Sequence, residues 1–112
     1  MLGSKNRLSK NRDFRYIYRQ GKNFASRTIA ITYIKSRNPN ELLIGFTASR
    51  KVAGAVERNR IKRVMRENIR HMIDDITPGH RIIFTARVQA NGSSYQKIGN
   101  DIKKLLDKAN LF

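Results

Sequence analysis

Hydrophobic and polar residues alternate in two stretches of the chain, as they do in half-buried β-strands. In residues 24–34, one face carries Ile29, Ile31 and Tyr33, and the other carries Thr28, Ala30 and Thr32. In residues 42–49, one face carries Leu42, Ile44, Phe46 and Ala48. The polar segment SRNPNE between them has the residues of a turn. We therefore expect two strands that pair with each other as a hairpin.

A first helix is predicted over residues 10–20, where the apolar spacing follows the helical repeat. Phe14, Ile17 and Tyr18 fall on one face of this helix. Ser9 or Asn11 has the side chain of an N-cap, and Gly21 is placed to end the helix.

A longer helix is predicted around ERNRIKRVMRENIR, residues 57–70. At 100° per residue its apolar side chains form one broad stripe, which we assign to the core. The stripe consists of Ile61, Val64, Met65, Ile69, Met72, Ile73 and Ile76. A neighbouring arc, here called the α-ridge, is formed by Asn59, Lys62, Arg63, Arg66 and Arg70. One side of this helix is thus apolar and the adjacent side carries positive charge.

The C-terminal part predicts a turn, a strand and a last helix. Pro78 and Gly79 suit the central positions of a type II turn. In the strand RIIFTARV that follows, the side chains expected to point inward are Ile82, Phe84, Ala86 and Val88. Ser93 with Gln96 fits a capping box for a helix whose stripe is Ile98, Ile102, Leu105, Leu106 and Ala109. The predicted order is helix, two or three strands, helix, strand, helix.

The charge of the chain narrows the class of partner. The 24 Lys and Arg against 8 Asp and Glu give a net charge of +16 in 112 residues, which points to a polyanion such as nucleic acid. No apolar segment approaches the ~18 residues of a membrane-spanning helix. The chain has no cysteine, and its first residues do not resemble a secretory signal. We expect a cytoplasmic protein of one domain, residues 1–112, with no membrane association.

A family resemblance rests on the basic helix and on three further segments. Arg58, Asn59 and Arg60, followed by Lys62, Arg63 and Arg66, resemble the RNR signature of the bacterial ribonuclease P protein subunit. The segments LSKNRDFRYIYRQGKNFASR, IGFTASRKVAGAVERNRIKR and GHRIIFTAR resemble the first helix, the strand into the basic helix and the last strand of that family. They occur in the family's order, and together they cover most of the chain.

The resemblance implies a fold and a function. The fold is a small α+β domain, an α/β sandwich of order αβββαβα, with a left-handed βαβ crossover where right-handed ones are far commoner. The function is that of an accessory subunit of ribonuclease P, the endonuclease that gives tRNA its mature 5′ end. Its RNA subunit is the expected catalyst and holds most of the Mg²⁺. The implied partners are ribonuclease P RNA and precursor tRNA, and no obligate protein partner is evident.

Two sets of site residues follow. The RNA-binding set is the RNR segment with the α-ridge: Arg58, Asn59, Arg60, Lys62, Arg63, Arg66 and Arg70. The second set matches, or is expected to line, the family's cleft for the single-stranded 5′ leader: Phe14, Tyr18, Arg50, Lys51, Arg12, Arg27, Thr32 and Arg87. Aromatic side chains suit such a cleft because stacking tolerates any base. Thr32 stands where the family has an aromatic residue, and the alternation places Tyr33 on the opposite face.

Other functions are less well supported by the residues. The main alternative is a structural RNA-binding protein such as a ribosomal protein, which has the same size and basicity. A protein-only nuclease would need a convergent acid cluster, and neither the adjacent Asp74 and Asp75 nor the distant His71 and His80 form one. A DNA-binding module would need a helix-turn-helix, for which TPGH provides no second helix. We therefore expect no catalytic residue and no metal site in the protein itself.

Overall fold

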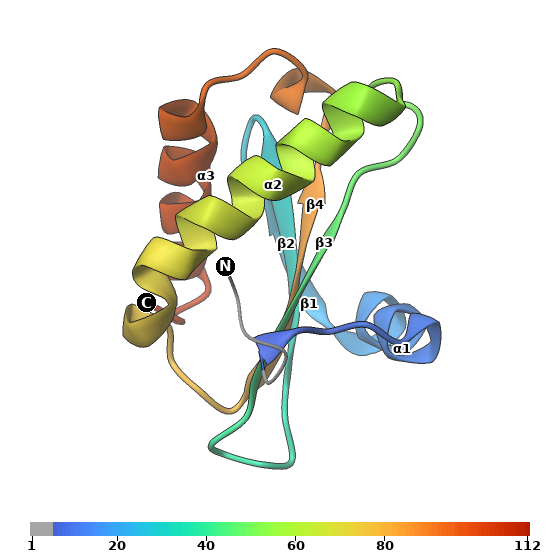
Figure 1. Cartoon of the computed structure of the whole chain (residues 1–112). Coiled ribbons are helices and arrows are strands. Elements are labelled where there is room, and N and C mark those ends of the chain that lie inside the picture. Colours follow the sequence, from blue (N-terminus) through green and yellow to red (C-terminus); the bar gives the residue numbers. More distant parts are fainter. Residues whose placement is uncertain (1–5) are drawn as a thin grey trace.

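The computed structural model describes residues 6–112, in which three helices cover a four-stranded sheet (Figure 1). The helices are α1 (Asn11–Gln20), α2 (Ala55–Met72) and α3 (Tyr95–Lys108). The strands are β1 (Lys22–Ala25), β2 (Ile29–Lys35), β3 (Leu42–Thr47) and β4 (His80–Ala86). Short 3-10 turns, η2 and η3, span Ile73–Asp75 and Val88–Ala90. The predicted α+β order αβββαβα is confirmed; residues 1–5, part of the segment weighed as a signal peptide, lie outside the described residues.

The sheet is mixed, and its strand order is β1-β2-β4-β3. Strand β2 pairs antiparallel with β1 and β4, whereas β3 pairs parallel with β4. Helix α2 connects the two parallel strands, as the βαβ unit of the resemblance requires. Strand β3 therefore lies at an edge of the sheet, beside α2.

The predicted hairpin between residues 24–34 and 42–49 is wrong. Strand β2 instead forms its hairpin with β1, and β4 lies between β2 and β3. The reason is burial: Ile82, Ile83 and Phe84 are consecutive and each is 0% exposed, so β4 is apolar on both faces and takes a central position.

The two faces of the sheet carry different layers (Figure 1). Helices α2 and α3 pack on the face of Ile31, Ile44 and Phe84, and form the larger core. Helix α1 packs on the other face, where Leu8, Ile17 and Ile83 form a smaller core. The predicted apolar stripes of α2 and α3 face the larger core, with Val64 and Ile73 only partly buried. Val88 is an exception to the predicted inward set: β4 ends at Ala86, and Val88 is 58% exposed.

The helix caps differ from the predicted ones. Helix α1 has Lys10 at its N-cap, without a side-chain hydrogen bond, instead of Ser9 or Asn11. The N-cap of α3 is Ser94, whose hydroxyl accepts from the Lys97 N–H, because the helix begins one residue later than the Ser93 box requires. Gly79 has φ +85°, as the type II turn predicted.

Gly21 ends α1 where the backbone of the sheet comes close. A Cβ at this position would lie 2.6 Å from the Ile17 carbonyl oxygen and 2.7 Å from that of Tyr33. Because both neighbours are backbone atoms, we expect Gly21→Ala to lower the free energy of unfolding by about 1–3 kcal/mol. Gly54→Ser is the control, since nothing lies within 4 Å of a Cβ there. Urea titrations of both variants measure the difference, and equal stability would show that α1 moves away without cost.

Candidate nucleic-acid interface

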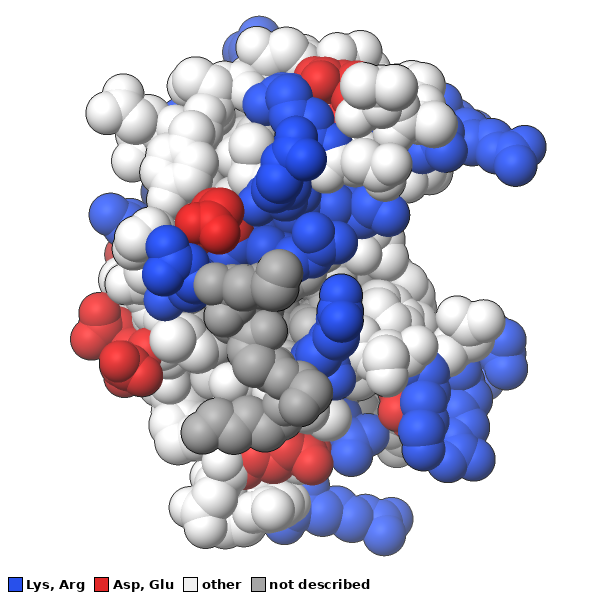
Figure 2. Space-filling model, viewed as in Figure 1, with Lys and Arg blue, Asp and Glu red and all other residues white. Residues whose placement is uncertain are grey.

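The outer side of α2 carries the densest positive charge. Its inner side buries Ile61, Met65 and Ile69, so the α-ridge on the neighbouring arc faces outward. Of the α-ridge, Asn59, Arg63 and Arg70 are exposed, and Lys62 and Arg66 are half-buried. Figure 2 shows Lys and Arg side chains as a band over α2. Such a row of cations along a rigid rod suits the phosphates of a folded polyanion.

The basic side chains of α2 fall into two groups according to their partners. Arg60 forms an ion pair with Glu57 (2.6 Å), Arg70 forms one with Glu67 (3.1 Å), and Arg58 donates to the Ala53 carbonyl (3.2 Å). Among residues 6–112, no carboxylate forms an ion pair with the three other cations. They are Lys62, Arg63 and Arg66. These three side chains, called here the unpaired triad, offer their charge to a ligand.

A groove of about 600 Å³ joins this triad to the edge of the sheet. Its apolar floor is made by Leu8, Phe14, Ile44 and Phe46, together with Gly45. Its polar lining is made by Arg7, Ser9, Glu67 and the triad. Figure 2 shows the molecule hollowed between α2 and α1. The groove thus combines apolar and aromatic surface with cations, which is what single-stranded nucleic acid requires.

Helix α1 forms the wall of the groove opposite α2. Phe14 is half-buried and lies against Gly45, because a Cβ there would run into the Phe14 ring. Tyr18 is 46% exposed, and its hydroxyl is within 3.1 Å of the Thr47 hydroxyl and 2.9 Å of the Thr85 hydroxyl. The polar end of Tyr18 is therefore attached to the sheet, while part of its surface stays accessible to a base.

Tyr18 is not part of the groove lining, and the remaining predicted cleft residues also lie outside it. Thr32 is 6% exposed and lies below the end of α1, near Gly21, whereas Tyr33 on the opposite face stacks with Phe24. Exposed positions are taken by Arg12 on α1, by Arg50 and Lys51 between β3 and α2, by Arg27 in the β1–β2 turn, and by Arg87 after β4. Arg87 donates to the Ser26 carbonyl (2.6 Å), which holds its guanidinium at that turn.

Arg7 and Phe46 are among the groove residues that were not predicted from the sequence. Arg7 lies in the groove because residues 6–8 run along the edge of β3, where the Leu8 N–H donates to the Ile44 carbonyl (3.0 Å). Phe46 was assigned only to one face of the second strand, and the position of that strand at the edge of the sheet leaves Phe46 partly open. No local pattern signals either feature, because both depend on where β3 lies in the sheet.

Glu57 connects the RNR segment to the loop before α3. Its carboxylate accepts from Arg60 through both oxygens, at 2.6 and 2.9 Å, and from the Gly92 N–H at 3.0 Å. Arg60 also donates to the Ser93 carbonyl (3.2 Å). The Arg60 guanidinium, and after it the Gly92 N–H, lower the pKa of Glu57 to about 2. Arg60 therefore positions this loop, and its charge is already matched.

The low pKa of Glu57 predicts a pH dependence. A carboxylate with a lower pKa in the folded state stabilises the protein fully above its unfolded pKa of 4.5 and loses this effect as the pH falls toward 2. We expect the difference in unfolding free energy between the parent and Glu57→Gln to be constant above pH 5 and to shrink below pH 4.5. Urea titrations from pH 2 to 7 measure it. A difference independent of pH would contradict the ionised contact.

The residues considered for catalysis and for metal binding lie near the end of α2 and in the segment that follows it. His71 is exposed beside Arg70, and Asp74 and Asp75 are exposed in η2. Within residues 6–112, no three His, Asp or Glu side chains are grouped as a metal site requires. The described helices include none that is long and apolar enough to cross a membrane.

The comparisons with known proteins all point to the same family. The profile of the family Ribonuclease P matches residues 2–110. The Ribonuclease P protein component of Clostridium kluyveri is 38% identical, over 95% of this chain and 96% of that protein. The one from Alkaliphilus oremlandii is 41% identical, over 95% and 92%. A solved structure of the Staphylococcus aureus RNase P protein has a TM-score of 0.87 at 32% identity, and covers 96% of this chain and 97% of that one. With the fold, the RNR segment and the basic groove in agreement, the chain belongs to the family of ribonuclease P protein components.

Proposed function

We propose that this chain, as the protein component of ribonuclease P, binds the catalytic RNA through α2 and holds the single-stranded 5′ leader of precursor tRNA in the groove. The observation that carries the proposal is the groove itself, where Lys62, Arg63 and Arg66 line the same space as Phe14. A structural RNA binder such as a ribosomal protein would account for the charge, but the family match does not favour it.

The two binding tasks use different chemistry. Exposed guanidinium groups at Arg63 and Arg70 suit phosphates of the folded RNA, because a planar fork binds two phosphate oxygens at once. Lys62 and Arg66 are half-buried in the groove that Arg63 also lines, where they can neutralise phosphates of the folded RNA and of the leader. Phe14 and the accessible part of Tyr18 offer ring faces to bases of any sequence. The groove therefore favours a substrate that still carries its leader over mature tRNA.

We assign the cleavage step to the RNA subunit. The donors around the groove are guanidinium, ammonium and hydroxyl groups, apart from Glu67, whose carboxylate is bound to Arg70. Such a donor set repels a divalent cation, so Mg²⁺ does not fit here and we propose that the RNA holds it. The protein's contribution is affinity: it adds contacts to the leader and offsets the charge of two RNA molecules brought together.

The experiment compares substrates with and without a leader. The holoenzyme reconstituted with this protein is expected to bind precursor tRNA with a leader of several nucleotides at least tenfold more tightly than mature tRNA. The RNA alone, at higher Mg²⁺, should discriminate less. Filter binding measures the affinity for precursor and for mature tRNA, once with the holoenzyme and once with the RNA alone. Equal discrimination with and without the protein would contradict leader binding in the groove.

A further inference from the structure

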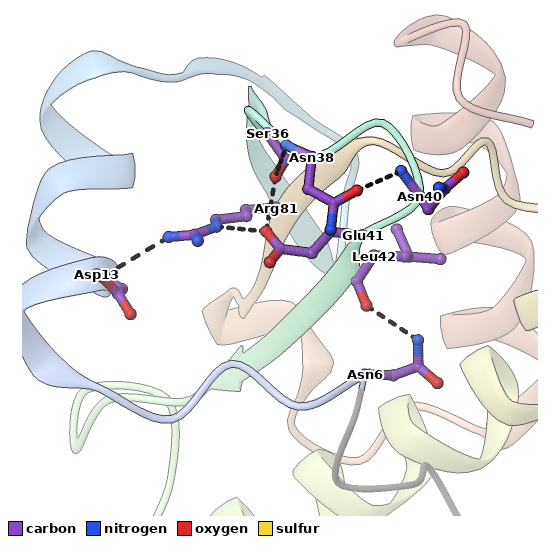
Figure 3. A network of polar contacts seen from close by, with 8 residues as sticks. All are labelled: Asn6, Asp13, Ser36, Asn38, Asn40, Glu41, Leu42 and Arg81. Atoms are coloured by element: carbon purple, nitrogen blue, oxygen red, sulfur yellow. Dashed lines mark hydrogen bonds and ion pairs between the residues drawn. The ribbon is translucent and has the colours of Figure 1, made fainter.

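We propose that Arg81 is a positioning residue that fixes α1 over the sheet and thereby sets the place of Phe14 in the groove. The inference rests on the proposed function, since it concerns the wall against which the leader would bind. Arg81 lies on β4, on the face that carries α1, and its guanidinium contacts two separate elements (Figure 3).

The two contacts join α1 to the loop before β3. Nε of Arg81 donates to Oε1 of Glu41 at 2.9 Å. Nη1 lies 3.8 Å from Oδ1 of Asp13, which belongs to the first turn of α1. We call Asp13, Glu41 and Arg81 the Arg81 bracket.

The loop end of the bracket is well supported. The Ser36 hydroxyl donates to Oε1 of Glu41 (2.6 Å), and the Asn38 N–H donates to the Ser36 oxygen (3.2 Å). The Asn40 N–H closes the loop onto Oδ1 of Asn38 (2.9 Å) (Figure 3). The Ser36 hydroxyl, and next to it Arg81, lower the pKa of Glu41, which is thus ionised at neutral pH. The Arg81 guanidinium, which extends from β4, is thus held between this hydrogen-bonded loop and α1.

The two carboxylates beside Arg81 indicate that this residue itself does not bind RNA. The chain has 8 acidic residues against 24 basic ones, and two of the 8 face this guanidinium. Its side chain is 34% exposed, beside 27% for Asp13 and 24% for Glu41. Ion pairs this accessible contribute little to the stability of a fold. Their effect here is geometric, because they join elements that are far apart in the sequence.

Helix α1 depends on such attachments because, among the described helices, it is the one on its face of the sheet, and the core beneath it, Leu8, Ile17 and Ile83, is small. The Tyr18 hydroxyl attaches its second half to Thr47 and Thr85. The bracket attaches its first turn. Phe14 lies between the two attachments, directly after Asp13, so freedom in the first turn would move the Phe14 ring away from Gly45.

The test is leader binding by the reconstituted holoenzyme. Arg81→Gln should weaken affinity for precursor tRNA with a leader of several nucleotides roughly fivefold, and leave affinity for a one-nucleotide leader and for ribonuclease P RNA unchanged. Asp13→Asn should reproduce the loss, and the double variant should be no worse than either single one, because both remove one attachment. Lys97→Gln is the matched control: it removes one charge and a 3.9 Å contact with Asp101 on the other face, and should have no effect.

A second measurement separates this inference from the proposed function. Amide hydrogen exchange of the first turn of α1 in the free protein should be faster in Arg81→Gln and Asp13→Asn, and unchanged in Lys97→Gln. Unchanged exchange in the first two variants would overturn the bracket whatever the binding assay shows. Equal losses for long and short leaders would also overturn it. If the parent holoenzyme does not distinguish leader lengths, the proposal of leader binding in the groove is wrong. The exchange result then decides by itself whether the Arg81 bracket fixes α1.

Discussion

Replacing Lys62, Arg63 and Arg66 together by glutamine is expected to weaken binding to ribonuclease P RNA on the order of 10³-fold. Each charge-assisted contact contributes about 1.5–3 kcal/mol, and the three losses need not add fully. The slope of log K against log salt should also fall by about 2 to 3, because about one counterion is released per neutralised phosphate. The three were chosen because they form no ion pair within residues 6–112.

The control for the triad removes the same charge elsewhere. Lys97, Lys103 and Lys104 are exposed on α3, so their replacement by glutamine lowers the net charge by the same amount. We expect this variant to lose less than tenfold in affinity at the same salt concentration. Titrations of labelled RNA at several salt concentrations compare the two variants. Equal losses would show that net charge alone, and not the α2 surface, determines binding.

Phe84→Ala is expected to lower the free energy of unfolding by about 3–5 kcal/mol. Phe84 is 0% exposed on the central strand β4, and its ring stacks on Phe46 with the centroids 6.0 Å apart. Truncation leaves a cavity between the sheet and α2 and removes much of the ~5–15 kcal/mol by which such domains are stable. We expect the variant to be partly unfolded unless RNA or another anion is bound.

Phe112→Ala serves as the comparison for Phe84. Phe112 is 44% exposed at the C-terminal end, and its truncation should change stability by less than about 0.5 kcal/mol. Guanidinium titrations followed by circular dichroism give both values. A loss for Phe84→Ala as small as that for Phe112→Ala would mean that the larger core is not packed around β4.

Local periodicity predicted the elements well, because each apolar stripe reports the face that its own element buries. Ile61, Met65 and Ile69 were assigned to the core from their spacing alone, and all are 0% exposed. The pairing of strands is a different matter. Alternation in β2 and β3 shows which side chains point inward, but not that β4 lies between the two strands. The sequence signal for a central strand was the run of three consecutive apolar residues Ile82–Phe84, all of which are buried in the structure.

The charges show the same limit for the candidate site. The sequence located the basic helix, yet it did not separate Arg60, whose charge is matched by Glu57, from Arg63, which forms no ion pair among the described residues. Local spacing permits the Arg60 pair, but the Gly92 contact that fixes Glu57 comes from 35 residues away. The Arg81 bracket likewise joins residues 40 apart. Side-chain partners of this kind become visible only once the tertiary fold is known.

The central claim is that this chain assists ribonuclease P RNA in removing the 5′ leader of tRNA, and cleavage at low Mg²⁺ tests it most directly. Precursor tRNA would be incubated with a bacterial ribonuclease P RNA, with and without the protein. We expect strong stimulation by the protein, with cleavage at the mature 5′ end. No stimulation under these conditions, together with tight binding of the protein to ribosomal RNA, would contradict the claim and identify a structural RNA binder instead.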